Sequence, residues 1–243
     1  KDVFREIFEG TDIGSNPTEK QNSFLMLSFD FSSVGSNTST IEELFHRNVR
    51  DAIHLFIEKY RKYLGEKADE LKKEIDSDGL ASGMLNTLLS FCRGKDLEVY
   101  VTIDEYDNFA NTILSTSGEQ KYHDLTHGEG FFRAFFNVLK SSTGGLNAPI
   151  SRLFVTGVSP ITMDDVTSGF NIGKNICLAP DIAEILGFTR EETEEIVNYY
   201  KETGKISHST GEIMAIMSDW YNGYSFSAHR QVNLFNTTQV LYF

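Results

Sequence analysis

The sequence contains little cysteine, proline, tryptophan or positive charge. Its 243 residues include 2 Cys, 4 Pro and 1 Trp, and 22 Lys and Arg stand against 35 Asp and Glu. The formal net charge of −13 argues against a general electrostatic grip on nucleic acid, because phosphate neutralisation needs clustered Lys and Arg. A local basic groove is still compatible with this charge.

The two cysteines stand in apolar surroundings. Cys92 falls in a predicted helix and Cys177 in a predicted strand, and two such residues are too few for a disulfide framework or a zinc site. No apolar run approaches the roughly 20 residues that span a bilayer, and no charged-then-apolar leader opens the sequence. We therefore expect a soluble protein of the reducing cytoplasm, without a membrane partner. With 40% hydrophobic residues, the chain can bury one large core or two smaller ones.

The most informative segment is residues 97–108, LEVYVTIDEYDN. An apolar β-type run ends there in the carboxylates Asp104, Glu105 and Asp107. Such a run predicts a strand buried on both faces, within a parallel sheet covered by helices. Ligands of such sheets bind at the carboxyl ends of the strands. Asp104 is therefore predicted to be a ligand of Mg²⁺, and Glu105 to polarise an attacking water. The alternative is a strand that simply runs into an acidic surface loop.

Strand-like and helix-like segments alternate along the chain, which predicts an α/β fold with a parallel sheet. The predicted strands are residues 24–31, 97–103, 152–158 and 172–178. Helical patterns cover residues 41–64 with Thr40 as N-cap, a solvated stretch at 67–78, and residues 79–92 and 131–139. Thr189 and Glu192 form a predicted capping box. We expect an α/β core over residues 1–179 and a smaller, mostly helical module over residues 180–243.

The third predicted strand ends in the sequence TGVSP. Its carboxyl end carries Thr156 and Ser159, small polar residues placed where a γ-phosphate or its water is sensed. We predict both as cofactor-binding residues.

Three other patterns have a plain structural interpretation beside a functional one. Residues 169–175, GFNIGKN, are one residue too short between the glycines for a phosphate-binding loop and follow the acidic strand instead of preceding it. His123 and His127 have the spacing of a zinc helix, but the glycines that follow favour a surface loop. The aromatic cluster at residues 219–226, DWYNGYSF, either fills a core or forms a stacking surface.

Several sequence blocks together resemble one family. They are FEGTDIGSNP, VTIDEYDN, LFVTGVSPI followed by SGFNIGKNI, GFTREE, and WYNGYSF followed by VNLFN. In this order they resemble the predicted AAA-ATPase-like proteins of bacteria and archaea over nearly the whole chain. The resemblance implies an additional-strand P-loop ATPase core that uses ATP and Mg²⁺, often followed by a restriction-endonuclease-like domain. It implies Walker B roles for Asp104 and Glu105 and places Thr156 in the sensor strand.

The sequence departs from this family in one respect: it contains no GxxxxGK[ST]. In the family the phosphate-binding loop lies upstream of the segment with which this sequence begins, so we expect a fragment that is inactive alone. Its parent would hydrolyse ATP, with a protein or nucleic-acid client bound through the missing domains. The strand before that loop lies inside the family's sheet, and its absence would leave strand edges unpaired. We predict that residues 24–31, 97–103 and 152–158 form adjacent parallel strands.

Two other functions stay open. One is a regulatory or protein-interaction module that does not hydrolyse nucleotide. The other is a metal-dependent phosphodiesterase that uses Asp104, Glu105 and Asp107 directly. Oligomeric state is not predicted, and Arg133, Arg152 and Arg190 are candidates for an arginine finger by chemistry alone.

Overall fold

The computed structural model describes residues 3–32, 40–126, 130–158, 172–227 and 232–243. The chain forms two compact units, residues 1–173 and 174–243. Each unit has its own hydrophobic core.

The larger unit is built on a parallel sheet. Its strands are β1 (Leu25–Asp30), β2 (Val99–Asp104) and β3 (Ile150–Val155), in the order β1-β2-β3. Both pairs are parallel, with Leu25 opposite Val99 at one end of the first pair and Asp30 opposite Asp104 at the other. The predicted adjacency and direction of these strands are confirmed.

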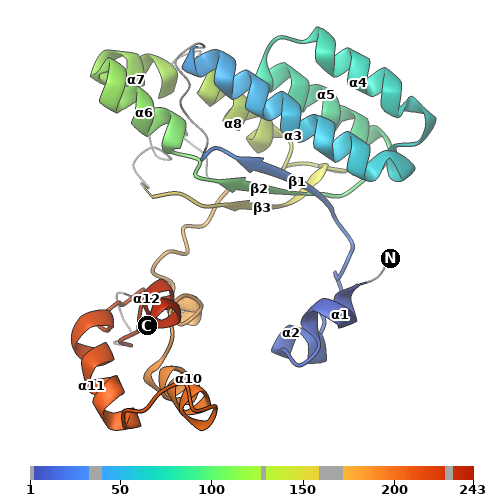
Figure 1. Ribbon diagram of the computed structural model, residues 1–243. Helices are drawn as coiled ribbons and strands as arrows, with labels where there is room; N and C mark the ends of the chain where they lie inside the picture. The colour runs from blue at the N-terminus through green and yellow to red at the C-terminus, as the bar shows by residue number, and fades with distance from the viewer. Residues whose placement is uncertain (1–2, 33–39, 127–129, 159–171, 228–231) are drawn as a thin grey trace. The chain divides into compact units, whose positions relative to one another are not determined.

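Helices α3 (Ile41–Leu64), α4 (Ala68–Ser77), α5 (Ala81–Gly94) and α8 (Phe131–Ser141) form a layer over one face of the sheet, as Figure 1 shows. The short η1 (Gly65–Lys67) joins α3 to α4. The predicted N-cap of α3 is confirmed: the Thr40 hydroxyl accepts the Glu43 N–H, and the Glu43 carboxylate accepts the Thr40 N–H, which completes a capping box. Helix α4 is less solvated than expected, since Ala68, Leu71 and Ile75 are buried.

Phenylalanine side chains fill the space between this helical layer and the sheet. The ring of Phe45 on α3 lies 5.1–5.3 Å from those of Phe31, Phe109 and Phe135, measured between centroids. All four residues are fully buried. Tilted and edge-to-face rings at these separations add attraction beyond the area that they bury.

The prediction that the acidic strand is buried on both faces is wrong. In β2, Val99, Val101 and Ile103 are buried, whereas Tyr100 and Thr102 are half-buried and Asp104 is exposed. The reason is visible in the sequence VYVTID, which alternates with period two and so gives the helices one apolar face. On the other face the hydroxyl of Thr102 donates to that of Ser28 on β1, 2.9 Å away.

Two further predictions of local structure are wrong. Residues 172–178 form no strand: they are turn and irregular backbone, and Cys177 is exposed. Gly173 and Asn175, both turn formers, interrupt this run. His123 lies in helix α7 (Glu119–Thr126) and not in a loop. Helix α7 follows α6 (Asn108–Ser117). His127 is outside the described residues. Helices α1 (Phe4–Phe8) and α2 (Asp12–Ser15) precede the sheet.

The smaller unit is mostly helical. It contains η2 (Pro180–Ile182), α10 (Arg190–Glu202), α11 (Thr210–Tyr221) and α12 (Thr237–Tyr242). The capping box of Thr189 and Glu192 is confirmed. Buried side chains of all three α-helices pack with Phe235, whose backbone bridges to that of Phe188.

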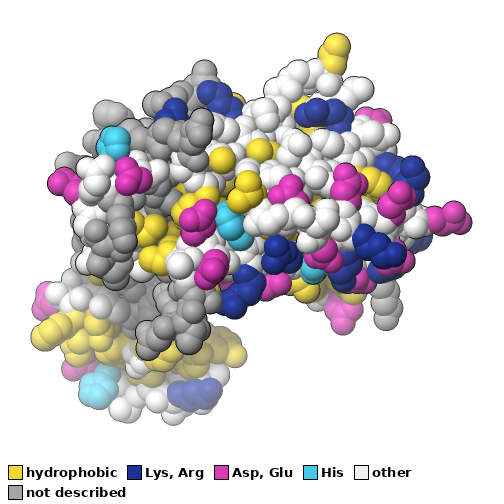
Figure 2. Space-filling view, turned by 90° about the horizontal axis from the view of Figure 1, so that it is seen from above, with side chains coloured by type: hydrophobic (Ala, Val, Ile, Leu, Met, Phe, Trp, Pro, Cys, Tyr) yellow, Lys and Arg dark blue, Asp and Glu magenta, His cyan; other side chains and the backbone are white. Residues whose placement is uncertain are grey.

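The surface carries charges of both signs. Seen from above the helical layer, Figure 2 shows Lys and Arg side chains interspersed with Asp and Glu. Ion pairs account for some of this mixing; the Arg61 guanidinium, for example, lies 3.2 Å from Glu58 and 2.9 Å from Asp69. None of the helices in the described ranges is long and apolar enough to cross a membrane.

Candidate functional site

The carboxyl ends of the three strands bring polar side chains into one row. Asp30 ends β1, Asp104 ends β2 directly opposite it, and Thr156 follows Val155, the last residue of β3. Because parallel strands end at the same edge of a sheet, segments that are far apart in sequence meet here. Asp104 and Thr156, which the sequence analysis placed at the ends of two different strands, lie next to each other here.

Asp104 is held from several directions. Its Oδ1 atom accepts hydrogen bonds from the Thr156 hydroxyl and from the Glu105 N–H, the latter at 3.0 Å. Its backbone oxygen accepts the N–H of Phe31, also at 3.0 Å. The carboxylate is nevertheless exposed. Asp104 is thus an exposed carboxylate whose position is fixed by hydrogen bonds.

Glu105 turns the chain sharply after β2. Its φ of +51° lies in the left-handed region, which non-glycine residues seldom adopt. Its side chain is half-buried and makes no hydrogen bond or ion pair within the described ranges. Asp104 accepts its two side-chain hydrogen bonds through Oδ1, whereas neither carboxylate oxygen of Glu105 has a hydrogen-bond partner among the described residues.

Asp107 points in a different direction from Asp104. It is 1% exposed, and its two carboxylate oxygens accept the Val158 N–H at 3.2 Å and the Asn111 side-chain amide at 2.9 Å. The three carboxylates of the motif therefore do not converge. No group of three or more His, Cys, Asp or Glu side chains in the described part of the chain is arranged to hold a metal ion.

Two residues at this edge were missed by the sequence interpretation. Hydrogen bonds from Ser32 hold the pKa of the Asp30 carboxyl below its ordinary value, and Asp30 lies opposite Asp104 in the register of the two strands. The Asn108 side-chain amide donates to the backbone oxygens of Phe31 and Ser32, at 2.9 and 3.0 Å. The signal for Asp30 was present, since LSFD ends in Asp as VTID does.

The comparisons with known proteins agree with this arrangement. A family model described as predicted AAA-ATPase matches residues 1–167, which include all three strands and the acidic motif. The chain belongs to the AAA-ATPase-like family. A search of curated proteins and a search of solved structures gave no match. Family membership indicates an ATPase-like, nucleotide-binding protein. The GFTREE and WYNGYSF blocks lie beyond the matched residues of this AAA-ATPase-like chain.

The remaining predicted residues of the AAA-ATPase-like chain are distributed as follows. Ser159 lies outside the described residues. Arg152 is exposed on β3 and donates to the Ser151 backbone oxygen, whereas Arg190 forms an ion pair with Glu194 at 3.0 Å. Arg152 does not lie in the row at the strand ends, and neither arginine is identified as an arginine finger.

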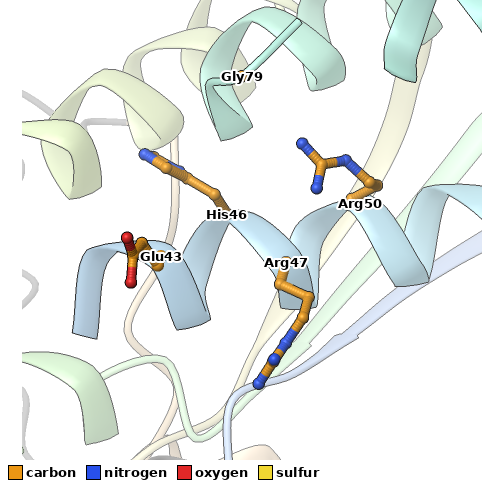
Figure 3. A pocket seen from close by; sticks show the side chains of 5 residues that line it. All are labelled: Glu43, His46, Arg47, Arg50 and Gly79. Carbon is orange, nitrogen blue, oxygen red and sulfur yellow. The ribbon is translucent and has the colours of Figure 1, made fainter. Parts of the chain in front are cut away.

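A pocket of about 320 Å³ lies elsewhere, against α3 and the turn before α5. It is lined by Glu43, His46, Arg47, Arg50 and Gly79. Figure 3 shows the Arg50 side chain pointing toward the turn at Gly79. The His46 Nδ1 accepts the Ala81 N–H, and Glu42 lies 3.6 Å from Nε2. None of the predicted site residues lines this pocket.

The aromatic cluster of the smaller unit is only partly a core. Trp220 is 76% exposed and Tyr224 is 41% exposed. Tyr221 is half-buried and packs against the core of this unit, with its ring centroid 5.8 Å from that of Phe243. The interpretation as a filled core is therefore wrong for Trp220.

Proposed function

We propose that the protein is the core of a Mg²⁺-dependent ATPase in which the strand ends form the hydrolytic site. The observation that carries this proposal is the fixed pair of Asp104 and Thr156, at the carboxyl ends of adjacent parallel strands. This is the edge where nucleotides bind to such sheets. The proposed client is a protein or nucleic acid, and the proposed location is the cytoplasm.

Each residue has a defined role in this proposal. Asp104 holds Mg²⁺, directly or through a water, and Thr156 senses the γ-phosphate, with Ser159 as a second candidate. Glu105 takes the proton of the attacking water, since its carboxylate is uncommitted among the described residues. Mg²⁺ commonly takes one or two protein carboxylates and completes its shell with phosphate and water, so the exposed Asp104 carboxylate fits this ion. When bound, the ion neutralises charge that develops on the phosphates.

The two edges of the sheet differ in whether a phosphate-binding strand could be added there. The outer edge of β1 is covered by side chains of α3, because the Tyr60 hydroxyl accepts the Met26 N–H at 2.9 Å and the Asn48 amide donates to the Asp30 oxygen at 2.8 Å. In the described part of the chain β3 has a partner strand on one side only, and Phe154 is 46% exposed. An open strand edge is a template for another strand.

The phosphate-binding loop is the part that this chain does not supply. Its amides and lysine provide most of the positioning and charge neutralisation in phosphoryl transfer. We therefore propose that residues 1–179 form an ATPase core that binds ATP only weakly alone, and that residues 180–243 form a satellite module.

Calorimetry tests this proposal. Mg²⁺-ATP is titrated into this chain and into a natural form extended upstream to include the loop. Binding to the longer form only supports an ATPase core, and equal binding to both forms refutes the argument about the loop. Absence of binding to either form refutes the proposal and favours a regulatory module.

The role of Glu105 is tested in the longer form. Glu105→Gln is expected to abolish turnover and to leave ATP affinity unchanged, because the amide keeps the shape of the side chain but cannot take a proton. Glu119→Gln, an exposed carboxylate at the start of α7, is the matched control and is expected to retain activity. Hydrolysis by Glu105→Gln at the parental rate contradicts the assigned base.

One observation favours a second candidate function, partner binding by the smaller unit. Trp220 and Ile216 lie one helical turn apart on α11 and are 76% and 47% exposed. Loss of partner binding in Trp220→Ala without any effect on nucleotide would support this function. The third candidate, a phosphodiesterase that uses all three carboxylates, is disfavoured because Asp107 is buried and engaged.

A further inference from the structure

The hydrogen-bond partners of Asp107 are unusual for its position. It occupies the N-cap position of α6, where an aspartate ordinarily accepts backbone N–H groups of its own helix. Here the side chain makes no such bond. It reaches instead to the Val158 N–H beyond the end of β3, and takes the Asn111 amide as its partner on α6. A carboxylate that is 1% exposed needs such donors, because burial removes its water.

Two further links join the same loops. The Tyr106 N–H donates to the Thr156 backbone oxygen at 3.1 Å, and the Thr156 hydroxyl donates to Asp104. Gly157 fits between them only because it lacks a side chain: a Cβ there would lie 2.4 Å from the Tyr106 ring and 2.6 Å from the Asp107 carboxylate. Asp104 and Tyr106 are thus hydrogen-bonded to Thr156, and Asp107 to Val158.

We propose that Asp107 is a positioning residue that fixes Thr156 against Asp104 and Glu105. The inference rests on the proposed function, since it concerns the geometry of that same hydrolytic site. Asp107 does not touch the reacting atoms. Its carboxylate holds the loop after β3, and the loop holds the γ-phosphate sensor. Release of the Val158 N–H lets Thr156 shift relative to the base, and a shift of about 1 Å in a reacting site costs up to roughly 100-fold in rate.

The i, i+4 pair of Asp107 and Asn111 allows a restoring substitution. In Asp107→Asn the new amide meets the Asn111 amide, donor against donor, unless one of them turns away from its present partner. Adding Asn111→Asp exchanges the two groups, so that an amide at 107 donates to a carboxylate at 111 while its oxygen still accepts the Val158 N–H. The matched control is Asp124→Asn, which alters a similar but exposed i, i+4 pair with the Gln120 amide at 3.1 Å.

The kinetic experiment uses the full-length natural chain. Asp107→Asn is expected to lower kcat by about 10- to 100-fold with KM for ATP changed less than about 3-fold, because the phosphate loop still holds the nucleotide. Restoration of kcat in the exchanged double variant, with Asp124→Asn at the parental value, supports the proposal. An unchanged kcat in Asp107→Asn, a failure of the exchange to restore it, or an effect on KM alone overturns it.

Amide hydrogen exchange tests the positioning role of Asp107 separately from the proposed ATPase function. If the parental chain hydrolyses no ATP, the proposed function fails, and the positioning claim is decided by exchange at Val158 and Tyr106. Faster exchange of both amides in Asp107→Asn, reversed in the double variant, supports the claim that Asp107 holds the loops together. Unchanged exchange shows that Asp107 does not hold them.

Discussion

Replacing Gly157 by alanine is expected to destabilise the protein strongly, although the residue lies at the surface. Its backbone φ is not in the left-handed region, so the cost is one of space and not of conformation. The added Cβ would lie 2.4 and 2.5 Å from two carbons of the Tyr106 ring and 2.6 Å from the Asp107 carboxylate. Ordinary contacts of a Cβ atom begin near 3.4 Å, so the neighbours must withdraw by about 1 Å.

The size of the destabilisation depends on which neighbours of the added methyl group can move. The Tyr106 ring is 6% exposed and cannot swing into solvent without leaving the core. Forcing a methyl group into such packing costs about 1–3 kcal/mol. Withdrawal of the strand end also loses the hydrogen bond from Val158 to Asp107, which contributes about 1 kcal/mol. We therefore expect the free energy of unfolding to fall by about 2–4 kcal/mol.

Urea unfolding followed by circular dichroism measures this change. Gly144→Ala is the matched control, because Gly144 lies in the exposed turn before β3 and a Cβ there meets nothing within 4 Å. This control is expected to change the free energy of unfolding by less than about 0.5 kcal/mol. If Gly157→Ala is as stable as Gly144→Ala, the close approach of the two loops does not exist.

Three further predictions concern single side chains. Burial raises the pKa of the Cys92 thiol to about 12, so under native conditions at pH 8 a thiol reagent should modify the exposed Cys177 alone, and both thiols after denaturation. The Asp30 carboxyl, hydrogen-bonded by Ser32, should titrate below its ordinary 3.8 in an NMR experiment; the stability that it contributes is present above the unfolded pKa and is lost as pH falls through the folded pKa. Trp220 fluorescence should resemble that of a solvated indole and be quenched readily by acrylamide, since the side chain is 76% exposed; a blue-shifted, protected emission contradicts this placement.

The larger unit could be predicted well where the signals are local. Helix α3 begins directly after Thr40, its predicted N-cap, and its apolar face is the one that is buried. The three observed strands follow from their apolar β-type runs, and their order follows from the family resemblance. The strand predicted at residues 172–178 is wrong. A strand needs a partner strand as well as an apolar run, and this run is interrupted by the turn formers Gly173 and Asn175.

The candidate site could be predicted in position but not in internal detail. The strand ends were expected to carry Asp104 and Thr156, and they do. The different environments of Asp104 and Asp107 were not predictable from spacing, because both are aspartates in one loop. The left-handed turn at Glu105 separates them: it leaves Asp104 at the exposed edge and is followed by a backbone that returns Asp107 to the interior.

The order of the strands also distinguishes Asp104 from Asp30, although each ends a strand in the same row. A strand at the edge of a sheet has one neighbouring strand, and on the outer side of Asp30 the Asn48 amide donates to its backbone oxygen. The central strand has two, so Asp104 receives the Phe31 N–H from one side and the Thr156 hydroxyl from the other. Only a carboxylate at the end of a central strand can be held from both sides while it still faces solvent. The topology therefore gives Asp104 hydrogen-bond partners from two neighbouring strands, one of which the same residue on an edge strand would lack.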